Sequence, residues 1–125
     1  MSNFYQDKIF SVKVIDNSYY EVRVFENQDF TVDDLAKLVD AQKNNGGVVL
    51  PVLVICENNV LADVILLSKL SQNEYNPYSK ADAFVLNSMA QKILANFYIK
   101  FNKPERPTKF FNNADEALIW LKQYM

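Results

Sequence analysis

The side chains that carry out most enzymatic chemistry are scarce in this sequence. Its 125 residues include no histidine and one cysteine, Cys56. Without histidine there is no Ser-His-Asp or Cys-His arrangement, and there is no imidazole ligand for a metal ion. The only glycines are adjacent, Gly46-Gly47, so neither a phosphate-binding loop nor a dinucleotide-binding fingerprint is present. We therefore expect no enzymatic activity, no cofactor and no metal site.

The remaining reactive groups favour structural roles. Asp33, Asp34 and Asp40 fall in one predicted helix, but Asp33 and Asp34 are adjacent and point apart, and nothing indicates a cleft in which an acid–base pair would converge. Cys56 lies in an apolar stretch, where burial keeps a thiol protonated. Asp63 is the one acid of residues 60–67, and we expect it to cap a helix that begins near residue 64 or to line a pocket.

Asn87 and Ser88 are the most suggestive polar pair. They follow a predicted strand and open a predicted helix, a position where α/β sheets often bind ligands. The dipole of that helix favours an anion or a phosphorylated serine there. The alternative, and the commoner role, is a simple helix cap.

The apolar patterns of the first half predict a hairpin, a helix and a central strand. Residues 8–15 and 19–25 alternate between apolar and polar side chains, and Asp16-Asn17-Ser18 between them is typical of a turn. Thr31 is expected to cap a helix that ends at residues 44–47. Residues 48–56 are apolar without alternation, which is typical of a strand covered on both faces.

The second half predicts further helices and strands in alternation. We expect a helix over 64–74, a strand over 81–87, a helix over 88–101, a strand over 108–111 and a helix over 113–124. In the helix over 88–101, Ile93, Leu94, Phe97 and Phe101 are expected to face the core. We expect Asn96 to be a buried, hydrogen-bonded amide, the alternative being a polar group of a pocket. Residues 1–125 therefore form one α/β domain, with a mixed five-stranded sheet and about four helices.

The charge is balanced overall and uneven locally. The net charge is −2, which argues against nucleic-acid binding. Residues 88–111 nevertheless carry five basic residues, Lys92, Lys100, Lys103, Arg106 and Lys109, against Glu105 alone. Such a surface meets phosphate groups, a membrane face or an acidic partner, although most charge runs are simply solvated helix faces.

The sequence gives no sign of export or of membrane insertion. No apolar run approaches the length of a membrane span, so we expect no integral membrane segment. The N-terminal residues lack the basic start and apolar middle of a signal peptide. A lone cysteine in an apolar strand fits a reducing compartment, and we expect a cytoplasmic protein.

The second half of the chain resembles the SpoIIAA-like fold, which STAS (anti-sigma factor antagonist) domains share with CRAL-TRIO lipid-binding domains. The resemblance rests on residues 81–88 (ADAFVLNS), 95–104 (ANFYIKFNKP) and 107–111 (PTKFF), which runs into 116–121 (EALIWL). It is nearest to small, uncharacterised bacterial proteins of the Bacteroidetes type. The remainder of the chain is similar only in the order of its elements.

The resemblance implies a regulatory role in protein–protein interaction. STAS antagonists dock an anti-sigma kinase and are switched by phosphorylation of a serine just after the third strand. Here that place reads Cys56-Glu57-Asn58-Asn59-Val60, without serine or threonine, so the phosphoacceptor is not carried over. The negative Glu57 could mimic a permanently modified state. The predicted contacts come from the loop over 57–63 and the helix over 88–101, with Glu57, Asn58, Asn87, Ser88, Lys92 and Lys100 as binding residues.

The lipid-binding relatives imply a second possibility, a small apolar ligand or lipid in an aromatic-lined pocket. The candidate lining residues, which could equally fill the core, are Phe84, Phe97, Phe101, Phe110, Phe111 and Trp120. A closed apolar cavity of about 300 Å³ or more would favour this possibility. Homodimerisation is also plausible, because the hairpin leaves an edge strand and Phe4, Tyr5, Tyr19 and Phe30 suggest apolar surface nearby.

Overall fold

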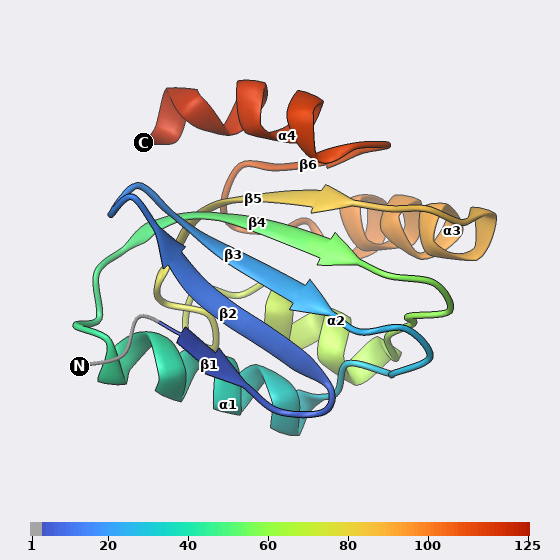
Figure 1. Cartoon of the computed structure of the whole chain (residues 1–125). Helices are drawn as coiled ribbons and strands as arrows, with labels where there is room; N and C mark the ends of the chain where they lie inside the picture. Colours follow the sequence, from blue (N-terminus) through green and yellow to red (C-terminus); the bar gives the residue numbers. More distant parts are fainter. Residues whose placement is uncertain (1–3) are drawn as a thin grey trace.

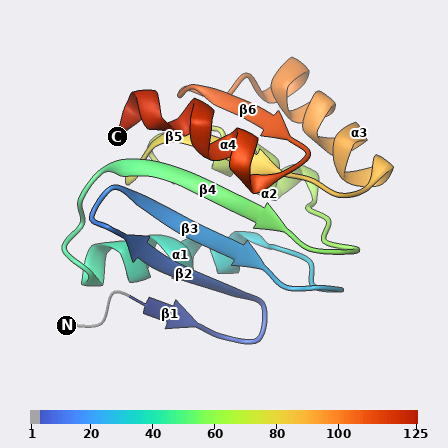
Figure 2. The same cartoon turned by 45° about the horizontal axis from the view of Figure 1, so that its top comes forward.

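A six-stranded mixed sheet forms the centre of the protein, whose computed structural model describes residues 4–125 (Figure 1). The strands lie in the sheet in chain order. They are β1 (Phe4–Gln6), β2 (Phe10–Ile15), β3 (Tyr19–Val24), β4 (Leu50–Cys56), β5 (Ser79–Val85) and β6 (Thr108–Phe111). The pairs β1–β2 and β2–β3 are antiparallel, and the pairs β3–β4, β4–β5 and β5–β6 are parallel (Figure 2).

The prediction of five strands is wrong by one. The additional strand, β1, is three residues long and pairs through Tyr5 opposite Val12. So short a segment cannot show an alternating pattern, and only its pairing to β2 defines it as a strand. The hairpin of β2 and β3 is confirmed, and its turn places Asp16 and Asn17 at positive φ, where a short polar side chain is tolerated.

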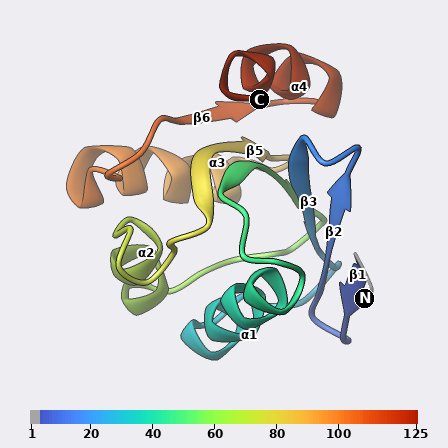
Figure 3. The same ribbon diagram turned by 90° about the vertical axis from the view of Figure 1, so that its left-hand side faces the viewer.

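The helices cover both faces of the sheet. They are α1 (Val32–Asn44), α2 (Val64–Leu70), α3 (Met89–Phe97), which continues as the π-helix η1 (Tyr98–Asn102), and α4 (Ala114–Leu121), followed by a 3₁₀ turn (Lys122–Tyr124). Right-handed crossovers that advance in one direction place α1, α2 and α3 on the same face. The last helix, α4, turns back and covers the opposite face (Figure 3).

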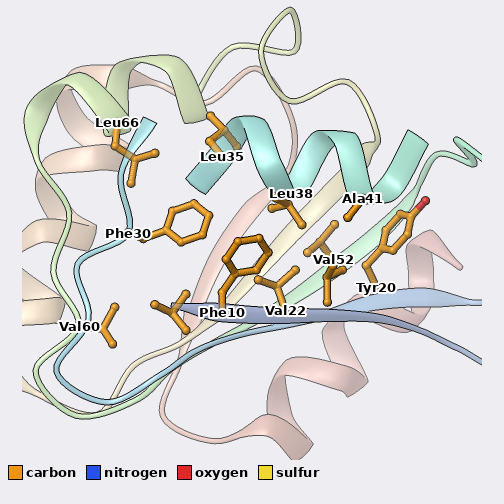
Figure 4. Packing of buried hydrophobic residues seen from close by; sticks show 12 residues of the cluster. Phe10, Tyr20, Val22, Phe30, Leu35, Leu38, Ala41, Val52, Val60 and Leu66 are labelled. Atoms are coloured by element: carbon orange, nitrogen blue, oxygen red, sulfur yellow. The ribbon is translucent and has the colours of Figure 1, made fainter. Parts of the chain in front are cut away.

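The larger part of the core lies between the sheet and α1 (Figure 4). The alternating residues Phe10, Val12, Tyr20, Val22 and Val24 all point into it and are buried. On the other face, Leu53 of β4 and the small residues of β5 pack against Ala117 and Leu121 of α4. No helix within residues 4–125 has the length and apolar character needed to cross a membrane.

The face of α3 that meets the core differs from the prediction. Gln91 and Ala95 of α3 are buried, as is Tyr98 at the start of η1, whereas Ile93 and Phe101 are 62% and 63% exposed. Two apolar stripes run along this helix, and periodicity alone does not decide which one faces the sheet. Asn96 is exposed rather than buried, and it lines a surface groove between α3 and β6.

A buried ion pair anchors the connector between η1 and β6. The Arg106 Nη1 lies 2.7 Å from the Asp82 Oδ2, and each side chain is 3% exposed. Arg106 also donates to the Leu70 carbonyl at 2.8 Å and to the Asn73 Oδ1 at 3.1 Å. Burial raises the pKa of the Asp82 carboxyl, and the Arg106 guanidinium opposes that rise. Arg106 therefore does not belong to the basic surface to which its place in residues 88–111 assigned it.

The apolar surface expected near the N-terminus is smaller than predicted. Phe30 is buried and stacks edge-on against Phe10, with ring centroids 5.4 Å apart. Tyr5 is partly buried and packs against the same core. Phe30 therefore does not contribute to an exposed dimer surface, while dimerisation through the hairpin stays a prediction.

Candidate functional site

Two of the predicted binding residues, Asn58 and Asn87, meet where the parallel strands end. Because β4 and β5 are parallel neighbours, the segments that follow them emerge at one edge of the sheet. There the Asn87 Nδ2 donates to the Asn58 Oδ1 at 2.5 Å. The neighbouring Asn59 Nδ2 donates to the Asn27 Oδ1, at 2.8 Å, in the segment that follows β3. These amides join three loops into one polar surface.

The carboxylate of Glu57 has partners within this surface. It accepts from the backbone N–H of Glu26 at 3.0 Å and lies 3.2 Å from the Arg23 Nη1. Its side chain is partly exposed, so its charge faces both the solvent and Arg23. Glu57 thus fastens the loop over 57–63 to the end of β3.

Gln91 is the residue of this site that sequence reasoning missed. Its Nε2 donates to the carbonyl oxygens of Glu57 at 2.8 Å and Val60 at 3.2 Å, and its Oε1 accepts from the backbone N–H of Asn87 at 2.9 Å. One buried amide therefore ties α3 to both loops. The sequence offered one signal for Gln91. It lies three and four residues before Leu94 and Ala95, and this spacing places a polar side chain on the same helix face as two apolar ones.

Ser88 acts as a helix cap. Its Oγ accepts from the backbone N–H of Gln91 at 3.2 Å, which satisfies one free donor of the first turn of α3. Asp63 caps α2 in the same way, accepting from the backbone N–H of Leu66 at 2.8 Å, as predicted. In both places the capping alternative of the sequence analysis is the one present in the structure.

The outer side of α3 and η1 carries an exposed apolar stripe, formed by Met89, Ile93, Phe97 and Phe101. Met89 is 70% exposed, and the rings of Phe97 and Phe101 stack with centroids 4.7 Å apart. The wider turn of the π-helix keeps Phe101 on the same side as Phe97.

Lys92 and Lys100 are exposed beside the apolar stripe. The Lys100 Nζ lies 5.5 Å from the centre of the Phe101 ring. The structure therefore places these two predicted binding residues on the helix, whereas Glu57, Asn58 and Asn87 lie in the loops. The two groups are joined through Gln91.

A surface groove lies between α3, β6 and the start of α4. Its volume is about 490 Å³. It is lined by Leu86, Lys92, Ala95, Asn96, Lys109, Phe110, Phe111, Asn112 and Glu116. Lys92 thus borders both the apolar stripe and this groove, whose own side chains are mixed in character.

An internal cavity of about 110 Å³, open to the solvent on one side, lies between the sheet and the helices α1, α2 and α3. Its walls are aliphatic and aromatic, and they include Val54 of β4, Phe84 of β5, Leu67 of α2 and Ala95 of α3. Cys56 also lines it, and burial raises the pKa of its thiol to about 12, so the thiol is protonated at neutral pH.

The six aromatic candidates separate into three groups. Phe84 and Phe110 line the internal cavity. Phe111 and Trp120 pack on the opposite face of the sheet, with ring centroids 5.8 Å apart, and Phe97 and Phe101 are exposed. Phe30 and Tyr98 also line the cavity, so its walls are partly aromatic, but its volume is smaller than the sequence analysis required of a ligand pocket.

Comparisons with known proteins identify the fold. Residues 15–125 match the model of a family described as a domain of unknown function, DUF7793. Among solved structures, an uncharacterised DUF3478-family protein from Shewanella loihica PV-4, which has a SpoIIAA-like fold, is similar with a TM-score of 0.60 and 16% identity. The match covers 90% of this chain and 91% of that one. No match is found among curated proteins. The chain thus has a SpoIIAA-like fold, as its second half indicated.

Proposed function

Since the chain belongs to the DUF7793 family and has a SpoIIAA-like fold, we propose that it is a non-catalytic regulatory module that docks onto another protein. The docking surface is the apolar stripe of α3 and η1 together with the loop over 57–63, which Gln91 ties to the same helix. The proposal includes a cytoplasmic location and a bacterial, Bacteroidetes-type origin, both from the sequence resemblance.

The observation that supports this function is the exposure of the apolar stripe. Met89, Ile93 and Phe101 are each more than 60% exposed, although they lie on one side of one helix at intervals of four or eight residues. Contiguous apolar surface of this kind is typical of interaction sites, and anchors at helical spacing are typical of helix-mediated docking.

The charges around the apolar stripe favour a partner surface that carries acidic side chains. Lys92, Lys100 and Lys103 are exposed beside it, and within residues 4–125 the salt bridges are formed by other side chains. The nearby Glu105 carboxylate accepts from the backbone N–H of Asn73 at 2.8 Å. We therefore propose a protein partner that presents apolar side chains flanked by aspartate or glutamate.

The absence of catalysis is part of the same proposal. It is supported by the lack of histidine in the sequence and by the raised pKa of Cys56, the single thiol. It is also supported by the polar residues at the end of the sheet, which fasten loops to one another through amide and carboxylate contacts.

Affinity purification from the host tests the docking surface. Tagged wild-type protein is compared with Ile93→Ser and Phe101→Ser, and with Ile119→Ser as the matched control. Ile119 is equally exposed but lies on α4, across the sheet. We expect a protein that co-purifies with the wild type and the control to be lost from both stripe variants. The proposal would be contradicted if the co-purifying protein were retained by all variants, or if no protein co-purified with the wild type.

A salt series and the variants Lys92→Ala and Lys100→Ala test the charge of the partner. Both lysines are exposed, so neither change should unfold the domain. We expect each variant to weaken the captured complex and to reduce its dependence on salt concentration. Unchanged binding would show that this basic surface takes no part.

A second candidate function, the binding of a small apolar ligand or a lipid, is supported by the internal cavity. The cavity lies in the layer between the sheet and the helices, and its walls are apolar. This function is compatible with docking, because the walls of the cavity and the apolar stripe lie on different sides of α3.

A further inference from the structure

We propose that the internal cavity is a binding site for one small, uncharged, apolar molecule about the size of a single aromatic ring. This inference rests on the second candidate function and narrows its ligand. The site is formed by the inner sides of α2 and α3 over β4 and β5, where Leu67, Leu94 and Ala95 face Val54 and Phe84.

The chemistry of the walls selects an uncharged ligand. The one amide that lines the cavity, Gln91, already makes three hydrogen bonds to the backbone. The Cys56 thiol stays protonated, since burial holds its pKa at about 12. A charged or strongly hydrogen-bonding ligand would lose its hydration here without gaining partners, which makes its transfer unfavourable.

The volume selects the size of the ligand. At about 110 Å³ the cavity is of the same order as the engineered apolar cavity of about 150 Å³ that stays dry and binds benzene or xenon. Sites for larger ligands usually have about 300 Å³ or more, so a lipid acyl chain requires an expansion that a single ring does not.

Access to the cavity is provided by the loop over 57–63. Leu61 lines the cavity and is also 41% exposed, so it lies between the interior and the solvent. Val60, which also lines the cavity, is held by its carbonyl hydrogen bond to Gln91. The backbone of Leu61 is held by a parallel bridge to Asp29, so the exposed Leu61 side chain marks a fixed mouth of the cavity, through which a small ligand enters without unfolding a helix or a strand.

Benzene binding to the full chain tests the site, with Ala95→Leu and Ala90→Leu as matched variants. Both changes add the same side chain to α3, but Ala95 lines the cavity and Ala90 is exposed. We expect benzene to raise the Tm of the wild type and of A90L by roughly 3 °C or more, and to leave the Tm of A95L nearly unchanged. Methyl NMR signals of Val54, Leu67 and Leu94 should shift, while that of Ile119 stays fixed.

A second variant keeps the test decisive if A95L does not fold. Leu67→Ala enlarges the cavity, and we expect it to bind naphthalene, which the wild type should exclude. Dodecanoic acid tests the lipid alternative. Binding of dodecanoic acid without benzene overturns the single-ring inference and leaves the second candidate function standing. Binding of neither compound by the wild type overturns both.

Discussion

The role of Arg106 depends on its environment and not on its charge alone. From the sequence, Arg106 counts among five basic residues of the stretch over 88–111 and is assigned to a positive surface. In the structure it is buried, pairs with Asp82, and reaches the backbone of Leu70 and the side chain of Asn73. It therefore fastens the end of η1 and the segment after α2 to β5. Composition counts a charge but does not show whether that charge is paired inside the protein.

Replacement of Arg106 by methionine should destabilise the protein strongly. Methionine keeps the apolar length of the side chain but leaves the Asp82 carboxylate buried without its cation, which costs about 3–5 kcal/mol of the free energy of unfolding. Urea denaturation at neutral pH measures this loss. Lys80→Met serves as the control. Lys80 is exposed and lies on β5, as Asp82 does, so this change should lower the free energy of unfolding by less than about 0.5 kcal/mol.

The loss caused by Arg106→Met should depend on pH. Burial already raises the pKa of Asp82, and without the guanidinium only the hydrogen bond from the Ser79 hydroxyl opposes that rise. An acid whose pKa is higher in the folded state binds more protons there, so stability decreases as the pH rises from the unfolded pKa to the folded pKa. We expect a smaller loss at about pH 4 than at pH 7, and Asp82→Asn combined with Arg106→Met should recover much of the stability. A loss that is the same at both pH values would show that the Asp82 charge is not its cause.

At the scale of the elements, the sequence predicts where helices begin better than which side they bury. Thr31, Asp63 and Ser88 cap helices as expected, and Asn113 caps α4, because a cap depends on one side chain and the next three backbone amides. The predicted orientation of α3 was wrong. Ile93, Phe97 and Phe101 form as good a helical stripe as Leu94, Ala95 and Tyr98, so the sequence pattern does not decide which stripe is buried. The second stripe is the buried one, because Ala95 and Tyr98 pack in one cluster with Phe84 and Leu86, and Gln91 meets the loop carbonyls.

The same limit explains what could be predicted of the candidate site. Glu57, Asn58, Asn87 and Ser88 were assigned to one binding surface through the resemblance, and Asn58 and Asn87 are in contact because parallel strands end at one edge of the sheet. Gln91 could not be assigned to it, because its role depends on carbonyl groups about thirty residues away in the sequence. Phe84 and Phe110 were among the predicted pocket residues, but the volume of the internal cavity was beyond prediction, since it is set by how α2 and α3 pack and not by the length or period of any element.

Ser88→Ala tests the capping role of Ser88 against a role as an anion site. Loss of the hydrogen bond to the Gln91 N–H should lower the free energy of unfolding by about 0.5–2 kcal/mol, and Ser88→Asp should retain it. Thermal unfolding measures both variants, with and without inorganic phosphate. We expect phosphate to leave the Tm of the wild type unchanged. A rise that disappears in Ser88→Ala would instead assign an anion site to the start of α3.

At the scale of the whole molecule, the regular order of the elements explains the division of surfaces. Three successive crossovers place α1, α2 and α3 on one face of the sheet, so that the cavity forms beneath α2 and α3 while α4 closes the other face. The α/β class was predictable from the order of the elements and from the apolar residues of β4, which do not alternate. The edge strand β1 was not, and homodimerisation through this hairpin stays a prediction that sedimentation measurements can decide.

This arrangement makes α3 the wall of two sites at once. Leu94 and Ala95 line the cavity, while Ile93 and Phe97 belong to the apolar stripe on the outside of the same helix. A ligand that changes the position or mobility of α3 therefore changes the surface that the partner meets. Equilibrium linkage requires the effect to be reciprocal, so the partner must change the affinity for the ligand by the same factor.

We accordingly predict that benzene changes the affinity of the protein for its captured partner. A coupling of the usual size corresponds to a change of about fivefold or more in Kd, measured by titration with and without saturating benzene. Ala95→Leu should bind the partner but lose the dependence on benzene, whereas Ala90→Leu, at an exposed position of the same helix, serves as the control for the added side chain. A Kd that is independent of benzene in the wild type, despite measured binding of both ligands, would show that α3 is rigid and that its two sides act separately.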